Sequence, residues 1–253
     1  MTADLKLKKI EIKNVTKFNR FKFKNIPLYY SLDMTKLKEV QLIPMGYRSV
    51  DPELSEIKLN PNISIIGDGA FEGCTTLTKV EGNPKSIGKK AFYFCLKLNS
   101  FPFDQVEELG DSAFEYTKIQ SFKAAGNLET IPENCFACCY LLKDIDLNHI
   151  KTIEHHAFEF ATLSHIVLPA TLRKVGNYAF KSCLFLTNIV SLAEEPPLIC
   201  ENTFSGCNIK NIWVVSPEAA KKYINHKHWS KYADKVKVLD LTQFTNDNFF
   251  MKQ

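Results

Sequence analysis

The sequence lacks long hydrophobic runs and a strong net charge. No stretch of about 18 consecutive apolar residues occurs, which argues against a transmembrane helix. The N-terminal residues, MTADLKLKKIEIK, also lack the apolar segment of a secretory signal. A net charge of +4 gives no general reason to expect nucleic-acid binding. We therefore expect either a protein that stays inside the cell or a chain that begins after its export signal.

The recurrent catalytic motifs are missing as well. The sequence contains no G-x-S-x-G, no glycine-rich phosphate loop and no H-E-x-x-H. These absences remove the motif-based reasons to expect an enzyme or a bound cofactor. We therefore predict a non-enzymatic protein without a cofactor, whose function resides on a surface.

What the sequence does contain is a repeat. A small residue followed by phenylalanine returns at steps of 21, 22, 22, 22, 22 and 24 residues. The pairs are Ala70-Phe71, Ala91-Phe92, Ala113-Phe114, Cys135-Phe136, Ala157-Phe158, Ala179-Phe180 and Thr203-Phe204. Four further apolar or small columns keep a near-constant offset from the phenylalanine. A period near 22 over six intervals predicts a solenoid, in which successive coils share one interior.

Residues 163–183, LSHIVLPATLRKVGNYAFKSC, are the clearest copy of the repeat. Its β-branched segment predicts a short strand that pairs in parallel with equivalent strands about 4.8 Å away, and Pro169 ends that strand. Gly176 predicts a tight turn, and the Ala-Phe pair is expected on a short helical turn. The fold class predicted is α/β: a right-handed horseshoe with a parallel sheet on the concave face and short helices or turns on the convex face.

The pattern L-x-x-I-x-L-P-x-x-L-x-x-I-G-x-x-A-F-x-x-C resembles the BspA-like leucine-rich repeat, the type known from treponemal and Bacteroides surface proteins. The resemblance covers residues 54–215, and the segments around Trp213 and Trp229 are similar to the end of Bacteroides members. It implies about 7–8 coils and a cell-surface or secreted protein that adheres to host matrix or neighbouring cells. This chain departs from the family pattern because most strand-end prolines are missing and no lipoprotein or secretion signal precedes the repeats.

We divide the chain into three parts. Residues 1–53 are expected to form a β-rich N-terminal cap with an irregular first coil, residues 54–215 the repeats, and residues 216–253 a C-terminal cap of helix and strand. Residues 1–36 hold nine Lys/Arg against three Asp/Glu, which fits an edge strand protected by lysine, with attraction to acidic partners as the alternative. In the C-terminal part, Ser216 and Pro217 predict a helix start, Trp229 should close the last coil, and residues 236–241 should add a strand.

The eight cysteines follow the repeat. Five occupy the small column, namely Cys74, Cys95, Cys139, Cys183 and Cys207. We expect buried, free thiols and no metal site, because cysteine is a small, readily buried residue. Disulfides between neighbouring coils, such as Cys74 with Cys95 or Cys183 with Cys207, are the alternative.

A remote enzymatic alternative also involves cysteine. The C-x-x-C-C run at 135–139, with His149, His155 and His156 downstream, is the best candidate for a zinc or thiol site. The repeat register places Cys135 and Cys139 in the core and the last two histidines among polar turn positions. That separation disfavours both the metal and the nucleophile.

The candidate binding surface is the concave face of the predicted sheet. In each strand the residues on either side of the inward apolar position should face outward. These candidates are Glu56, Lys58, Lys79, Glu81, Lys123, Asp144, Asp146, His165, Asn188, Asn211 and Trp213. An exposed tryptophan is a common binding anchor, although Trp213 is alternatively expected under the C-terminal helix.

We expect this face to bind a protein or glycan partner, host extracellular matrix included, with no nucleic acid and with the chain as a monomer. The localisation expected from the resemblance is the cell surface or the medium, and the alternative is the cytoplasm. In that alternative the chain is an intracellular scaffold for protein–protein interaction.

Overall fold

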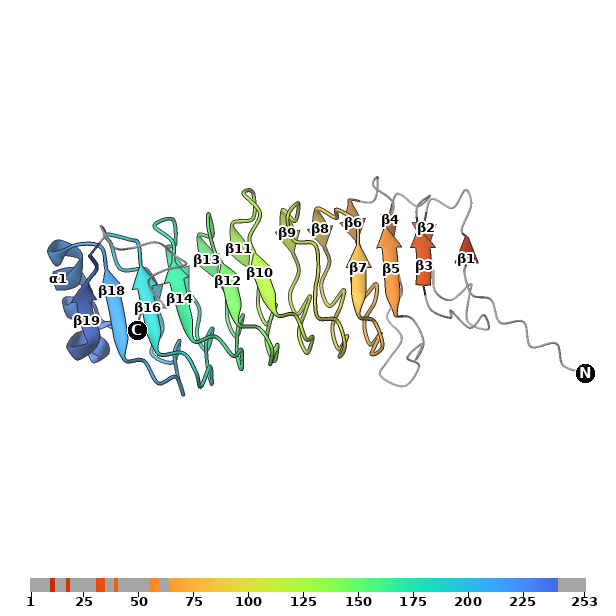
Figure 1. Ribbon diagram of the computed structural model, residues 1–253. Coiled ribbons are helices and arrows are strands. Elements are labelled where there is room, and N and C mark those ends of the chain that lie inside the picture. The colour runs from red at the N-terminus through yellow and green to blue at the C-terminus, as the bar shows by residue number, and fades with distance from the viewer. Residues whose placement is uncertain are drawn as a thin grey trace, which may run out of the picture.

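A computed structural model describes residues 55–59 and 64–240, together with the backbone of four short strands within 10–40. Figure 1 shows an elongated stack of coils, about eight turns in all, with parallel strands and little helix. The predicted solenoid is therefore confirmed. The predicted N-terminal cap, residues 1–53, lies largely outside the described residues.

One strand from most of the coils contributes to the first face of the solenoid. β1 (Ile10–Glu11), β3 (Ser31–Met34), β5 (Glu56–Leu59) and β7 (Lys79–Glu81) form one parallel sheet, β10 (Ser121–Lys123) and β12 (Asp144–Asp146) a second. A third contains β14 (His165–Leu168), β16 (Asn188–Ser191), β18 (Asn211–Val214) and β19 (Val236–Val238). We call the outward side of β5, β7, β10, β12, β14, β16 and β18 the long-strand face. The inward residues of these strands stack in register, as in Ile166 with Ile189 and Ile189 with Ile212.

The long-strand face is interrupted between β7 and β10. The repeat predicts that Phe101, flanked by the outward Ser100 and Pro102, continues it, yet the structure assigns no strand to residues 99–103. Pro102 cannot donate to a ladder, and its two phenylalanine neighbours pack inward instead. The rings of Phe101 and Phe103 lie 4.9 and 5.1 Å from that of Phe114, both edge to face. The break in hydrogen bonding is thus filled by aromatic packing.

A second set of strands, two residues each, lies on the other side of every coil and was not predicted. One sheet contains β2 (Lys17–Phe18), β4 (Glu39–Val40), β6 (Ile65–Ile66), β8 (Ser86–Ile87) and β9 (Glu108–Leu109). Another contains β11 (Thr130–Ile131), β13 (Thr152–Ile153), β15 (Lys174–Val175) and β17 (Leu198–Ile199). We call this side the short-strand face. In strands such as β6, β11 and β15 the first residue is exposed and the second is buried.

The segments that carry Ala-Phe are turns and not short helices. Residues two before and two after the phenylalanine are left-handed: Lys90 has φ 55° and Phe94 has φ 62° on either side of Phe92. A right-handed helix cannot pass through such residues. The N–H of Phe92 donates instead to the carbonyl oxygen of Ala113 in the next coil, at 2.8 Å. Among the described residues the only helices are α1 (Pro217–Asn225) and the 3-10 helix η2 (Ser230–Lys235).

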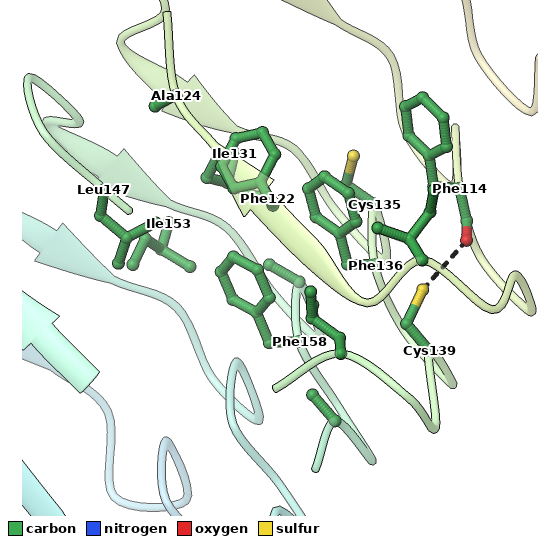
Figure 2. Packing of buried hydrophobic residues seen from close by; sticks show 14 of the residues in the cluster. Phe114, Phe122, Ala124, Ile131, Cys135, Phe136, Cys139, Leu147, Ile153 and Phe158 are labelled. Carbon is green, nitrogen blue, oxygen red and sulfur yellow. Dashed lines mark hydrogen bonds between the residues drawn. The ribbon is translucent and has the colours of Figure 1, made fainter. Parts of the chain in front are cut away.

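The phenylalanines of the repeat form one buried stack along the solenoid. From Phe71 to Phe204, neighbouring ring centroids lie 5.3 to 5.6 Å apart with interplanar angles of 3° to 17°. Figure 2 shows the rings of Phe136 and Phe158 side by side in the core. Stacked rings add specific contact energy to the burial of large apolar area. This confirms the column on which the predicted fold depended.

Glycine in the column before the Ala-Phe turn allows close approach between coils. A Cβ at Gly110 would lie 2.3 Å from the backbone nitrogen of Lys89, and one at Gly176 would lie 2.6 Å from that of His155. Neither glycine has a positive φ. The column therefore serves contact with the preceding coil, whereas the sequence suggested only a tight turn.

The C-terminal end of the stack is covered by α1, Trp229 and β19, which is shorter than the strand predicted at 236–241. Ser216 caps α1, its Oγ accepting from the N–H of Ala219 at 3.0 Å, and Pro217 begins the helix. Trp229 is fully buried, 5.8 Å from the ring of Phe204, and its Nε1 donates to the carbonyl oxygen of Pro197 at 2.9 Å. β19 then pairs in parallel with β18. The apolar end of the last coil is therefore covered by aromatic side chains and shielded from solvent.

Candidate functional site

The outward residues of the long-strand face line up from strand to strand. Glu56 lies opposite Lys79, and Lys58 opposite Glu81. Further along, Lys123 lies opposite Asp146. The structure thus brings most of the predicted site residues into rows, with a first group on β5, β7, β10 and β12 and a second group on β14, β16 and β18. Rows of this kind offer a partner one side chain from each coil.

Charges dominate the first group. Lys79 and Glu81 form an ion pair along their own strand. The hydrogen bond between them raises the pKa of the Lys79 ammonium and lowers the pKa of the Glu81 carboxyl. Across the break at 99–103, Asp146 accepts a hydrogen bond from the N–H of Asn148 at 3.1 Å. These charges alternate in sign, so the group favours a partner with a complementary pattern rather than one of uniform charge.

Hydrogen-bonded amides dominate the second group. The Nδ2 of Asn211 donates to the Oδ1 of Asn188 at 2.7 Å, and the Nζ of Lys237 donates to the Oδ1 of Asn211 at 2.7 Å. His165 stands next to Asn188 in the register. Sequence reasoning missed Lys237, although its position between Val236 and Val238 is the alternation typical of a strand. The Oδ1 of each asparagine thus accepts one hydrogen bond in the ladder, and the Nδ2 of Asn188 donates to the hydroxyl of Thr187 at 3.0 Å.

Trp213 lies on the long-strand face and is half-buried. It pairs in register with Val190 and with Lys237, whose Nζ lies 5.2 Å from the ring centroid. A cation over an indole face is a favourable contact. Trp213 was alternatively expected to lie beneath the C-terminal helix and cover the last coil. Trp229 covers the last coil instead. Val190, expected to face outward beside it, is fully buried.

His165 is half-buried at the start of β14. Its Nδ1 lies 3.1 Å from the hydroxyl oxygen of Ser164. Burial lowers the pKa of the imidazole, and the nearby carboxylate of Asp144 opposes that shift. His165 is therefore held mainly as a neutral ring that can donate and accept hydrogen bonds near pH 7.

The cysteines and histidines of the remote enzymatic alternative are kept apart. Cys135 and Cys139 are fully buried, and burial raises the pKa of both thiols, that of Cys139 to about 12. His156 is engaged with Glu159, 2.5 Å from Nδ1 to Oε2, and His155 accepts from the N–H of Asn177 at 3.2 Å. No group of three or more possible metal ligands occurs in the described part of the chain, where all eight cysteines are free.

A family model described as the BspA type leucine rich repeat region matches the chain in six copies, over residues 3–84, 43–161, 79–187 and 151–246. The chain belongs to the BspA-type leucine-rich repeat family. The resemblance seen in the repeat is thereby confirmed. Members of this family have a repeat fold that generally serves in binding and not in catalysis. No curated protein sequence matches the chain.

Two solved bacterial structures align with this chain. A leucine rich cell surface protein from Faecalibacterium prausnitzii A2-165 aligns with a TM-score of 0.57 and 23% identity, over 77% of this chain and 52% of that one. A leucine-rich repeat protein from Bacteroides ovatus ATCC 8483 aligns with a TM-score of 0.43 and 21% identity, over 79% and 65%. This chain thus spans about half the length of the F. prausnitzii protein. Within the part that the structure describes, no helix is long and apolar enough to cross a bilayer.

Proposed function

We propose that this chain is a non-enzymatic binding module of a bacterial cell-surface or secreted protein, which binds a protein or glycan partner through the long-strand face. The observation that carries the proposal is the in-register row of His165, Asn188 and Asn211, with Trp213 two residues beyond Asn211 on β18. Amide, imidazole and indole groups held one coil apart suit a polar, extended ligand. The repeat fold keeps them rigid, so little side-chain entropy is lost on binding.

The adhesive role rests on the family and on the fold neighbour described as a cell surface protein. Adhesion to host matrix or to neighbouring cells requires that the chain be exported. Fractionation of the producing cells tests that requirement directly, because a strictly cytoplasmic location contradicts adhesion. The intracellular scaffold remains the competing function, and it predicts that cytoplasmic result.

The binding test uses the purified chain on a panel of matrix proteins and glycans. N188K together with N211K places two ammonium groups in the amide ladder and should abolish binding to the recognised member. L198N is the matched control, because Leu198 is 64% exposed on the short-strand face. Binding that survives N188K/N211K, or that falls equally with L198N, contradicts the long-strand face as the site. Silence across the whole panel contradicts the adhesive function.

A further inference from the structure

Apolar side chains project from turn corners along one edge of the solenoid. Each coil passes from its small column to its inward leucine by a turn, and three of these turns contain an extra residue that is apolar. In the first, the N–H of Leu98 donates to the carbonyl oxygen of Cys95 at 3.0 Å, so Leu96 and Lys97 occupy the corners. The corresponding corners are Tyr140-Leu141 and Leu184-Phe185, closed by bonds of 3.0 Å from Leu142 to Cys139 and from Leu186 to Cys183. We call Leu96, Tyr140, Leu141, Leu184 and Phe185 the corner residues.

Turn corners normally carry glycine, proline, asparagine, aspartate or serine. Here the corner residues are apolar and exposed, from 38% of Leu141 and 39% of Leu96 to 63% of Phe185 and 66% of Leu184. Such side chains gain little from folding, because they stay in water. An exposed apolar group that recurs on one edge marks an interaction site.

Aromatic rings lie beside the corners on the same edge. Phe160 is 39% exposed and lies 6.4 Å from the ring of Tyr140. Toward the N-terminus, the rings of Phe94 and Tyr116 lie 4.9 Å apart in adjacent coils. Because the coils stack in register and the solenoid is elongated (Figure 1), these groups lie along a line rather than around a pocket. A protruding line suits a broad, flat target better than a small ligand, which prefers a concave site.

The charge along this edge is positive. Lys97, Lys118 and Lys143 are exposed beside the corners, and none of the three has an ion-pair partner among the described residues. Of the carboxylates on this edge, Glu159 is paired with both His156 and Lys181, at 2.5 and 2.8 Å, and Glu115 is half-buried. A second copy docking edge to edge would bring like charges together, which disfavours self-association.

We propose that this edge is a docking surface for an anionic phospholipid bilayer, separate from the long-strand face. Leucine, phenylalanine and tyrosine at the corners enter the interfacial region, where such residues are favoured, and the lysines contact the acidic headgroups. A rigid rod engages a flat surface at several corners at once, so that individually weak contacts add. No part of the chain needs to span the bilayer.

The experiment is co-sedimentation of the full chain with sucrose-loaded vesicles of phosphatidylcholine alone, or of phosphatidylcholine and phosphatidylglycerol in equal parts. We expect binding to the mixed vesicles that weakens with added salt, and much less binding to phosphatidylcholine alone. K97Q/K118Q should weaken binding by about fivefold for each lysine removed. L184S/F185S should weaken it by at least about tenfold, because the two most exposed apolar side chains are lost.

L198S is the matched control, because Leu198 is 64% exposed and lies on the short-strand face. The thermal transition of each variant by circular dichroism identifies any loss caused by unfolding. The proposal is overturned if the native chain does not bind mixed vesicles, or if L184S/F185S binds as the native chain does. It is also overturned if neither the native chain nor L184S/F185S binds vesicles and the two substitutions weaken binding to a member of the protein panel. That result would assign this edge to a protein partner. N188K/N211K should retain vesicle binding, so this test stands apart from that of the long-strand face.

Discussion

The thiol of Cys139 donates a hydrogen bond to the carbonyl oxygen of Phe114 in the preceding coil, at 3.2 Å (Figure 2). The same bond recurs from Cys95 to Phe71, from Cys183 to Phe158 and from Cys207 to Phe180, at 3.0 to 3.2 Å. The small column therefore supplies a donor between coils as well as the space for close packing. This bond accounts for a cysteine-rich column without disulfides or metal.

The cysteines should differ sharply in reactivity. With iodoacetamide at pH 8, we expect Cys200 and Cys207 to react in the native protein, because both are partly accessible and a hydrogen bond with Cys183 lowers the pKa of Cys207. Cys139 should react only after unfolding, because burial raises its pKa to about 12 and leaves almost no thiolate. Peptide mass spectrometry before and after denaturation measures this order. Alkylation of Cys139 at the rate of Cys207 would contradict the buried column.

Truncation within the phenylalanine stack should be costly. F136A removes a fully buried ring that stacks on both neighbours, so we expect a loss of about 3–5 kcal/mol in the free energy of unfolding. F160A, at a ring 39% exposed on the edge, should cost less than about 1 kcal/mol. Urea denaturation compares the two. Similar costs for both variants would mean that the stack is not the main stabilising column.

Alanine substitutions at two glycines distinguish the effect of close contact between coils from the effect of glycine on the flexibility of the unfolded chain. G110A should destabilise by at least about 1–3 kcal/mol, because its Cβ would lie 2.3 Å from the Lys89 nitrogen and the coils must move apart. G126A is the control, since a Cβ there meets nothing within 4 Å. It should be neutral or slightly stabilising through the unfolded state. Thermal denaturation of the pair gives the difference, and equal midpoints would be evidence against the tight packing of coils.

The hydrogen bond between Tyr223 and Ser191 suits a double-mutant cycle. Their hydroxyl oxygens lie 2.5 Å apart in the covered end of the stack, and both residues are fully buried. Y223F leaves the serine hydroxyl without this partner and should cost about 1–3 kcal/mol. Y223F with S191A should cost less than Y223F alone, because no buried hydroxyl is then left unsatisfied. Additive losses in urea denaturation would show that the two hydroxyls act independently.

His165 should make stability depend on pH. Its folded pKa is lowered by burial, so the unfolded chain binds more protons between that pKa and the ordinary value near 6.5. Stability therefore falls as pH decreases through this window and is retained above it. H165Q should flatten this part of the profile of unfolding free energy against pH. An imidazole that titrates above 6.5 by NMR would reverse the predicted slope.

The sequence predicts well the features that depend on a repeated pattern. The stack of Phe71 to Phe204, the inward rows of the long strands and the cover by Trp229 all follow from spacing and side-chain size. The left-handed residues beside each Ala-Phe turn could not be predicted in the same way, since Lys90, Phe94 and Tyr116 carry no glycine-like signal. Hydrogen bonds between coils hold them in a conformation that their own preference disfavours.

The site was less predictable than the fold. The outward positions of His165 and Asn188 follow from alternation, but their bonding depends on neighbours one coil away. Lys237 entered the amide ladder because β19 pairs with β18, a contact across 24 residues that no local pattern specifies. The short-strand face was missed because two residues are too few to show a period, so Ile66 and Ile131 were interpreted as core alone.

The extra residue in the turns at Leu96, Tyr140 and Leu184 recurs every 44 residues, so beyond β7 the natural unit of this solenoid is a pair of coils that have the same length and differ in this turn. Removal of one coil would keep the interior continuous and yet put every later corner out of step with the earlier ones. Removal of two coils would restore the alternation of turns with and without the extra residue. Gain or loss of coils in pairs is therefore the change in length that leaves the outer edge of this protein with the same spacing as before.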